Sequence, residues 1–400
     1  MKKTFGKKGV FWVGFVCIGF FLAGHAGADP AVTAAAPKLP SADLRQLTTG
    51  DCTSWNGDWS PDGKWIVYQR DKTGQSWKAD IYKIRVDGTE ETQLTSGYYC
   101  DSKPQFSPNG KQIVFQRNTL AEGASKVGEK SSIWVMNADG SNQKQIVAPM
   151  EEDKGGAQWP FWSPDGKWIA YMYGERRQKG LWVIKADGTG PQEVIPADFG
   201  EVPGIAMDWK PKGSKKQILV SVRTESREAP SKRGRHIALV EFDPKGKKPT
   251  TQTWLTDSSS DTADQTYSKW SPNGKSIVYS DDSNNRADIW LMNSDGTNKV
   301  RLTDSASNND ACYNHPNWSP NGKYLAYQTS EGTSSRSKRK IYIMTADGLY
   351  KNCLMSDENI RQSGRSDYLL HFNRKGTMIL FEGRDQTTNK DQLFVLELHK

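Results

Sequence analysis

The sequence predicts an all-β protein built from seven repeated units, and three features of the 400-residue chain predict this fold class. An aromatic residue followed by Ser-Pro-Asp/Asn-Gly-Lys recurs along the chain, as in Trp59–Lys64. An Asp-Gly pair such as Asp87-Gly88 follows most copies, and short β-rich runs lie between these two signals. Repeats of about 40–50 residues with four strands each are typical of the blades of a β-propeller. We therefore expect a seven-bladed β-propeller of four-stranded antiparallel blades.

The aromatic residue that opens the repeated segment marks each blade. These anchors are Trp59, Phe106, Trp162, Trp209, Trp270, Trp318 and Phe372. The copies after Trp209 and Phe372 are degraded, with Lys210 and Asn373 in place of the serine. Stacked units bury faces that a single unit leaves exposed, so we expect each anchor to fill the space between neighbouring blades.

The first repeat shows how four strands, a to d, follow from the residues. Strand a ends at the anchor, and Ser60-Pro61-Asp62-Gly63 suits a type I turn. Strand b is Trp65–Tyr68, and strand c is Asp80–Ile84, which ends at an Asp-Gly hairpin signal. Strand d is Thr92–Thr95. The blade is therefore predicted to be an antiparallel meander.

The two ends of the repeat region are expected to share one blade. After Phe372 the chain supplies a strand b at Thr377–Phe381 and a strand c at Gln392–Leu398, but no strand d. An unassigned d-type segment, Leu44–Thr48, precedes the first anchor. Pairing it with the last blade satisfies an otherwise exposed edge. We expect residues 44–400 to form one propeller closed by this N-terminal strand.

The first 28 residues have the pattern of a cleaved export signal. Four lysines precede an apolar run, and Ala26-Gly27-Ala28 suits the cleavage site. An uncleaved membrane anchor is the alternative, although the apolar run is short for a bilayer span. Residues 29–43, rich in Ala and Pro, are predicted to be a disordered leader. We expect a periplasmic or secreted protein without an integral membrane span after cleavage.

The charge of the chain does not favour a nucleic-acid partner. The net charge of the whole chain is +8. The signal contains four lysines and no acidic residue, so its cleavage leaves a net charge of +4. Four cysteines remain after cleavage, and an even number in an oxidising compartment suggests disulfides. Cys52 and Cys100 precede neighbouring anchors by similar distances, so we predict that these two form a disulfide. Cys312 and Cys353 are not expected to pair, and no cysteine spacing suits zinc.

The d–a and b–c loops lie on one face of such a disc and vary more than the turns on the other face. Loops on a rigid scaffold commonly carry binding residues. Acidic d–a loops near the channel mouth and basic b–c loops further out would steer a charged partner, although such charges also serve solubility. The predicted partner-binding residues are Asp51, Trp55, Tyr99, Asp101, Arg233, Arg235, Asp310, Tyr313, His315 and Arg339.

The chain has few candidates for catalysis. It contains no Gly-x-Ser-x-Gly elbow, no His-Glu-x-x-His pair and no phosphate-binding glycine loop. His315, at the entrance of an inner strand, could serve as a ligand or base, or equally as a hydrogen-bonded loop residue. The acidic loops lack the dense spacing of a calcium loop. We expect no catalytic residues and no cofactor, with a structural or catalytic divalent cation as the alternative.

The repeat, with Ile-Trp/Tyr-x-Met-Asn-x-Asp-Gly-Thr and Leu-Thr after the turn, resembles the WD-like repeats of TolB-type propellers over about residues 44–400. The resemblance implies an exported, partner-binding protein of the cell envelope. The chain departs from TolB because it lacks the additional N-terminal α/β domain, and because the TolB propeller has six blades. Seven-bladed relatives include oligogalacturonate lyases, which use a histidine-rich manganese site. His315-Pro316 resembles part of that site, but Asn317 stands where a second histidine is expected.

These observations lead to one main hypothesis and two alternatives. The main hypothesis is a non-catalytic exported propeller, a monomer, that binds an envelope protein or an acidic polysaccharide through its d–a and b–c loop face. The first alternative is a metal-assisted polysaccharide lyase of the oligogalacturonate type at the channel mouth, with His315 as a ligand. The second is a purely structural module within a larger assembly.

Overall fold

The computed structural model describes one compact unit, Lys38–Lys400, together with Pro37 of a separate unit, Met1–Pro37. The residues described are 37–71, 78–120, 130–150, 155–175, 178–199, 207–213, 216–225, 233–246, 250–256, 264–282, 286–306, 311–331, 338–355, 360–361, 370–385 and 387–399. The predicted export signal and most of the predicted leader lie outside these residues. Within the described residues, no helix is both long enough and apolar enough to span a membrane.

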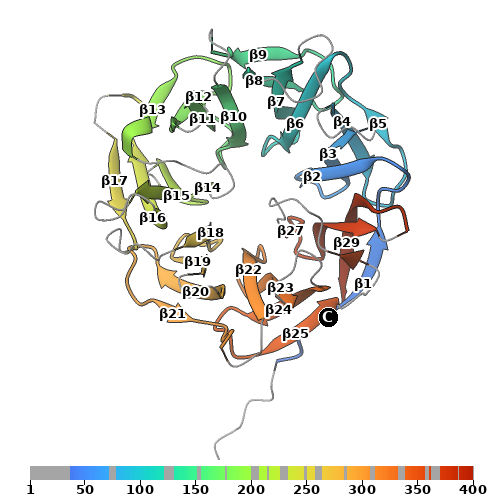
Figure 1. Ribbon diagram of the computed structural model, residues 1–400, viewed down its shortest axis with the longest axis vertical. Coiled ribbons are helices and arrows are strands. Elements are labelled where there is room, and N and C mark those ends of the chain that lie inside the picture. The colour runs from blue at the N-terminus through green and yellow to red at the C-terminus, as the bar shows by residue number, and fades with distance from the viewer. Residues whose placement is uncertain are drawn as a thin grey trace, which may run out of the picture. The chain divides into compact units, whose positions relative to one another are not determined.

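The unit is an all-β fold in which antiparallel meanders are arranged around a common centre (Figure 1). Three sheets have four strands each. The first contains β2 (Thr53–Trp59), β3 (Trp65–Asp71), β4 (Asp80–Arg85) and β5 (Thr92–Gln93). The second contains β14 (Met207–Trp209), β15 (Lys216–Glu225), β16 (Arg233–Phe242) and β17 (Thr251–Trp254). The third contains β18 (Gln265–Trp270), β19 (Ser276–Asp281), β20 (Asp288–Asn293) and β21 (Val300–Arg301).

The other two sheets are larger. The eight-stranded sheet contains β6 (Tyr99–Phe106), β7 (Gln112–Thr119), β8 (Ser131–Asn137), β9 (Lys144–Val147), β10 (Gly155–Trp162), β11 (Trp168–Glu175), β12 (Gln178–Lys185) and β13 (Gln192–Ile195). The nine-stranded sheet contains β1 (Ser41–Gln46), β22 (Ala311–Trp318), β23 (Tyr324–Glu331), β24 (Lys338–Thr345), β25 (Lys351–Met355), β26 (Ile360–Arg361), β27 (His371–Phe372), β28 (Met378–Asp385) and β29 (Lys390–His399). A short 3-10 helix, Ala197–Phe199, follows β13.

The predicted count of seven blades is wrong, because the strands form five sheets. Two of the five each join successive meanders. In the eight-stranded sheet, a parallel bridge between Gly156 and Ser131 connects β10 to β8. A Cβ on Gly156 would lie 2.3 Å from the carbonyl oxygen of Ser131, so only glycine permits this approach. In the nine-stranded sheet, β26 pairs with both β24 and β28.

The repeated turns have the predicted chemistry. In the first one, the Ser60 hydroxyl donates to Asp62 Oδ1 (2.6 Å) and accepts from the N–H of Trp65 (2.9 Å). The N–H of Gly63 donates to the carbonyl of Ser60 (2.9 Å), and Gly63 has a φ of +71°. Each Ser-Pro-Asp/Asn-Gly segment is therefore a side-chain-stabilised turn, in which glycine adopts the left-handed conformation.

The aromatic anchors fill the spaces between successive meanders, as predicted. Trp59 packs with Leu380, Leu393 and Val395 from the C-terminal strands. Trp270 packs in the same way with Leu219 of the preceding sheet. Because such apolar clusters recur around the unit, its roughly 360 residues do not depend on one large core.

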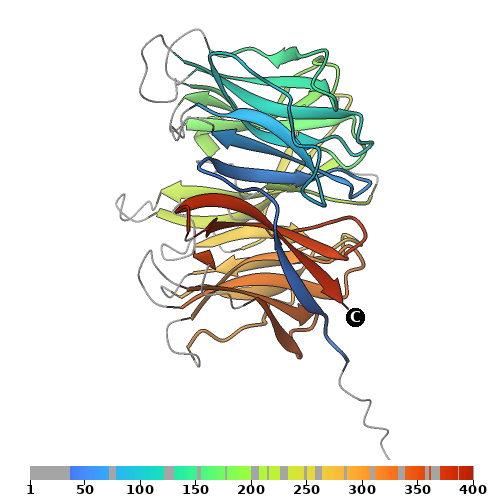
Figure 2. The same ribbon diagram turned by 90° about the vertical axis from the view of Figure 1, so that its right-hand side faces the viewer.

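The N-terminal strand closes the unit, as predicted. β1 pairs antiparallel with β29, with Leu44 opposite Leu396 and Gln46 opposite Phe394. Figures 1 and 2 show β1 (blue) beside β29 (red), although these strands lie at opposite ends of the described chain. The strand begins at Ser41, three residues earlier than the predicted Leu44.

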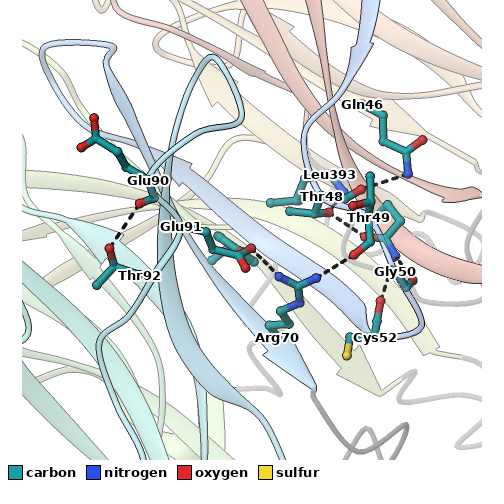
Figure 3. A network of polar contacts seen from close by, with 12 residues as sticks. Gln46, Thr48, Thr49, Gly50, Cys52, Arg70, Glu90, Glu91, Thr92 and Leu393 are labelled. Carbon is teal, nitrogen blue, oxygen red and sulfur yellow. Dashed lines mark hydrogen bonds and ion pairs between the residues drawn. The ribbon is translucent and has the colours of Figure 1, made fainter.

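Side chains after β1 strengthen this closure (Figure 3). The Thr48 hydroxyl donates to Gln392 Oε1 (2.7 Å) and accepts from the N–H of Leu393 (2.9 Å). Gln392 Nε2 in turn donates to the carbonyls of Gly50 (3.1 Å) and Cys52 (2.8 Å). Thr48 and Gln392 are both buried, so these bonds are shielded from water.

Arg70, on β3, connects the closing segment to the first sheet. Its guanidinium donates to the carbonyl of Thr49 (2.7 Å) and pairs with Glu91 (Figure 3). Glu91 also accepts a hydrogen bond from the hydroxyl of Tyr68. The segment after β1 is therefore tied both to the last strand and to the first sheet.

Candidate functional site

The innermost strands enclose a cavity of about 520 Å³. Strands of all five sheets contribute to its wall, including β2, β6, β10, β14, β18, β22 and β28. The four anchors Trp162, Trp209, Trp270 and Trp318 line it, and so do the turn residues Pro164, Pro211 and Pro272. The volume and the apolar wall with a few polar groups are typical of a ligand site.

A β-bulge in the inner strands shapes one end of this cavity. The pairing register shifts between Trp55 and Asp58, and equivalent shifts occur in β6, β10, β18 and β22. At each shift, the residue three positions before the anchor has a φ between +53° and +55°. These residues are Asn56, Lys103, Trp159, Tyr267 and His315. A bulge re-aims the side chain it carries, and three of the five, Asn56, Lys103 and Trp159, line the cavity.

Side chains of neighbouring meanders stabilise three of these left-handed residues. Gln69 Oε1 accepts the N–H of Lys103 (3.1 Å), and Gln116 Oε1 accepts the N–H of Trp159 (3.2 Å). Glu382 accepts the N–H of Asn56 in the same way. Because every acceptor is ten residues after an anchor, one repeated hydrogen bond compensates for a conformation that non-glycine residues rarely adopt.

The bulge residues also contact one another across strand boundaries. The Lys103 ammonium donates to Asn56 Oδ1 (2.9 Å) and lies 3.6 Å from the ring centroid of Trp159. On the other side, the rings of Tyr267 and His315 have centroids 3.9 Å apart. The cavity wall therefore already seats one ammonium group against an aromatic face.

A second set of polar residues, one position before the anchor, joins consecutive inner strands. Asp58 Oδ2 accepts the N–H of Phe106 (2.9 Å), and Asp208 Oδ2 accepts the N–H of Trp270 (2.8 Å). Gln105 Oε1 accepts the N–H of Trp162 (2.7 Å). Asp58, Gln105 and Asp208 all line the cavity, so their side chains serve both the closure of the wall and its surface chemistry.

The enclosed position changes the acid–base properties of three wall residues. Removal from water raises the pKa of Asp58 to about 7, although two backbone hydrogen bonds act in the opposite direction. Removal from water also raises the pKa of Asp208, with nearby Lys269 lowering it. Burial lowers the pKa of His371 to about 4, and the charge of Lys269 adds to this effect. At neutral pH, His371 is therefore uncharged and Asp58 is near its midpoint of titration.

The structure divides the predicted partner-binding residues into an interior group and a surface group. Trp55 is buried with Ala79, Cys100 and Leu120. Asp101 is fully buried and forms a bidentate pair with Arg117, with both N–O distances at 2.7 Å. These two side chains support the loops from inside and do not face a partner.

Tyr313 and His315 also lie inward. Tyr313 is half-buried, and its ring packs edge-on against Tyr327 with centroids 6.0 Å apart. His315 is buried, and its Nδ1 lies 2.8 Å from Asn314 Oδ1. His315 therefore packs into the wall beside Tyr267, outside the residues that line the cavity.

The surface group contains three predicted residues with described side chains. Asp51 and Tyr99 are exposed, and the Arg117 guanidinium lies 4.5 Å from the Tyr99 ring centroid. Arg235 is half-exposed and pairs with Asp264 at 3.1 Å. Asp310 and the side chains of Arg233 and Arg339 lie outside the described residues. The predicted residues whose side chains are described do not lie together in one site.

The predicted disulfide is not formed in the structure. Cys52 and Cys100 are both thiols, as are Cys312 and Cys353. Cys100 is buried in the apolar cluster around Trp55, and Cys52 is half-buried beside the closing segment.

The residues that line the cavity were not among the predicted site residues. A signal for them was present, because a polar or charged residue precedes six of the seven anchors, with Phe161 as the apolar exception: Asp58, Gln105, Asp208, Lys269, Asn317 and His371. Their repetition at one register predicts a shared face. The variable loops, from which the predicted residues came, do not carry this repeated signal.

The fold and its repeats define the chain as a β-propeller. Comparison with known protein families shows which β-propeller family it belongs to. The model of the TolB beta propeller domain matches residues 38–195 and 119–396. The chain therefore belongs to the TolB β-propeller family, in agreement with the resemblance seen in its repeats. No curated protein is similar enough in sequence to count as a match.

Solved structures confirm the fold at low sequence identity. An oligogalacturonate lyase in complex with manganese is 11% identical, with a TM-score of 0.64, over 90% of this chain and 97% of that one. An oligogalacturonate lyase from Vibrio parahaemolyticus is 10% identical, with a TM-score of 0.63, over 89% and 97%. The β-propeller domain of the trilobed protease from Pyrococcus furiosus is 12% identical, with a TM-score of 0.56, over 87% and 97%.

The described residues do not fit a manganese site. Among them, no three His, Cys, Asp or Glu side chains are grouped so that they could hold a metal ion. The ring of His315, the predicted ligand, packs against Tyr267, and Asn317 stands where a second histidine was expected.

Proposed function

We propose that this chain is an exported, non-catalytic binding protein that holds a segment of an envelope protein or polymer in its central cavity. The observation that carries the proposal is the cavity of about 520 Å³ enclosed by strands of all five sheets. Membership of the TolB β-propeller family supports a role in partner binding. Export is supported by the pattern of residues 1–28.

The geometry favours the end of the channel that carries the repeated turns. The cavity extends from the bulge residues to the turn prolines Pro164, Pro211 and Pro272. Asp51 and Tyr99 precede the bulges of β2 and β6, so they belong to the opposite end of the inner strands. We therefore place the main contact on the turn side, and the exposed loop residues provide at most an additional contact.

We do not propose a lyase activity for this chain. The similarity to oligogalacturonate lyases concerns the fold, since their sequences are 10% and 11% identical to this chain. The residue predicted to act in such a reaction, His315, does not line the cavity.

Capture of partners from a solubilised envelope extract of the producing cells tests the proposal. Trp159→Ala removes an aromatic wall of the cavity, and Arg235→Ala changes the predicted loop face. We expect Trp159→Ala to reduce recovery of the main captured species at least about tenfold, since an aromatic contact is commonly a binding hot spot. Arg235→Ala should change recovery less than about threefold. Unchanged capture by a folded Trp159→Ala variant would exclude the cavity, and loss with Arg235→Ala alone would favour the loop face.

A further inference from the structure

Asp58 differs from the other residues at its register in the cavity wall. Gln105 and Asn317 occupy equivalent positions and are neutral, and Asp208 has the Lys269 ammonium 3.8 Å from its Oδ1. Asp58 accepts the N–H of Phe106 and that of Trp59, and no ion pair joins it to any residue that the structure describes. It is a cavity carboxylate without a cation of its own.

The surroundings of Asp58 suit a cationic group. Indole and phenyl rings make up much of the wall, and Lys103 shows that an ammonium can lie against one of them at 3.6 Å. The two lysines that line the cavity are already engaged, Lys103 with Asn56 and Trp159, and Lys269 with Asp208. A carboxylate near aromatic faces is a common arrangement for recognising cations.

We propose that Asp58 recognises a basic side chain, a guanidinium or an ammonium group, which a partner polypeptide inserts into the cavity. This inference rests on the proposed function and names the chemistry of the group that the cavity takes. An incoming cation removes the cost of an unpaired carboxylate in an enclosed site, so most of its contribution comes from desolvated charge pairing. The cation also lies against the aromatic wall.

The pH dependence of binding follows from the charged groups of the cavity. Those that line it besides Asp58 are Lys103, Asp208, Lys269, His371 and Glu382. His371 has a pKa of about 4 and stays neutral above pH 6, while the pKa of Asp58 is about 7. Only the ionised form of Asp58 attracts a cation. Affinity for a basic group should therefore fall about tenfold from pH 8 to pH 6.

Titration with N-acetyl-arginine amide, followed by calorimetry and tryptophan fluorescence, tests the inference on the mature protein. N-acetyl-citrulline amide is the matched neutral probe, and putrescine tests a free polyamine as the source of the cation. We expect the arginine probe to bind at least about tenfold more tightly than the citrulline probe at pH 8, and to lose that advantage at pH 6. Tighter binding of putrescine than of the arginine probe would contradict a polypeptide as the source.

Two variants distinguish the role of Asp58 from that of Asp208, which holds the equivalent position before another anchor. Asp58→Asn should remove both the preference for arginine and its pH dependence. Asp208→Asn should retain them, because Lys269 already neutralises Asp208. Equal binding of both probes to the wild type at pH 8, or an unaltered preference in Asp58→Asn, would overturn the inference. If the arginine probe fails while Trp159→Ala still lowers capture, the inference fails and the proposed function stands.

Discussion

Deletion of residues 38–48 should lower the free energy of unfolding by about 5 kcal/mol or more. The deletion removes the whole of β1 and the buried side chain of Leu47, and a buried leucine alone contributes about 2–5 kcal/mol. It also leaves Gln392 and the N–H of Leu393 without Thr48, which adds about 1–3 kcal/mol for unsatisfied buried groups. Thermal unfolding should move down by about 5–10 °C relative to a chain that begins at Lys38.

The same deletion exposes the edge of β29, since β1 is the strand that covers it. An uncovered edge strand pairs readily with another chain, so the deletion variant should also self-associate during size-exclusion chromatography. The point variant Thr48→Val keeps β1. Its free energy of unfolding should fall only by the contribution of the Thr48 hydroxyl. An unfolding curve unaltered by the deletion would show that β1 is not required for closure.

Asp58→Asn should stabilise the protein at pH 8 and have little effect at pH 4. The pKa of Asp58 is about 7 in the folded chain and 3.8 in its ordinary state, so the folded state binds the proton more tightly. Wild-type stability from this group therefore falls as pH rises from about 4 to about 7, and stays low above that. Asparagine does not ionise and still accepts the N–H of Phe106. The gain at pH 8 should be about 1–4 kcal/mol.

His371 makes this prediction more specific, because its effect has the opposite sign. Its pKa is about 4 when folded and 6.5 ordinarily, so stability is lost as pH falls below about 6.5. The two groups oppose each other in the wild type between pH 4 and pH 6.5. In Asp58→Asn the opposing contribution of Asp58 is removed, so stability should rise more steeply over that range than in the wild type. Denaturant unfolding at pH 4, 6 and 8 measures this, and parallel curves for the two proteins would refute the assignment.

Much of the fold could be predicted because it depends on local sequence patterns that recur along the chain. The turn at Ser60–Gly63 depends on residues within six positions of one another, and the closing strand was identified from an unpaired d-type segment. The number of sheets could not be predicted in this way. It depends on the approach of Gly156 to Ser131 and on the pairing of β26 with both β24 and β28, which no local pattern reveals.

The site was harder to predict than the fold, because burial decides which polar residues face a ligand. Asp101 reads as an exposed loop acid, yet it lies opposite Arg117 in the strand register and is neutralised there. His315 reads as a channel residue, yet its left-handed backbone turns its ring onto Tyr267. In the sequence, Asp58 is one of several polar residues that precede an anchor. Its raised pKa arises only from its position in the cavity.

Site-specific photocrosslinking tests most directly whether partners bind in the cavity on the turn side. A photoreactive phenylalanine analogue would replace Phe161, which lines the cavity, or Tyr99, which is exposed on the predicted loop face. After irradiation of whole cells, we expect a discrete crosslinked species from position 161 and a weaker one, or none, from position 99. A strong adduct from position 99 with none from position 161, in proteins of equal stability and abundance, would contradict the account.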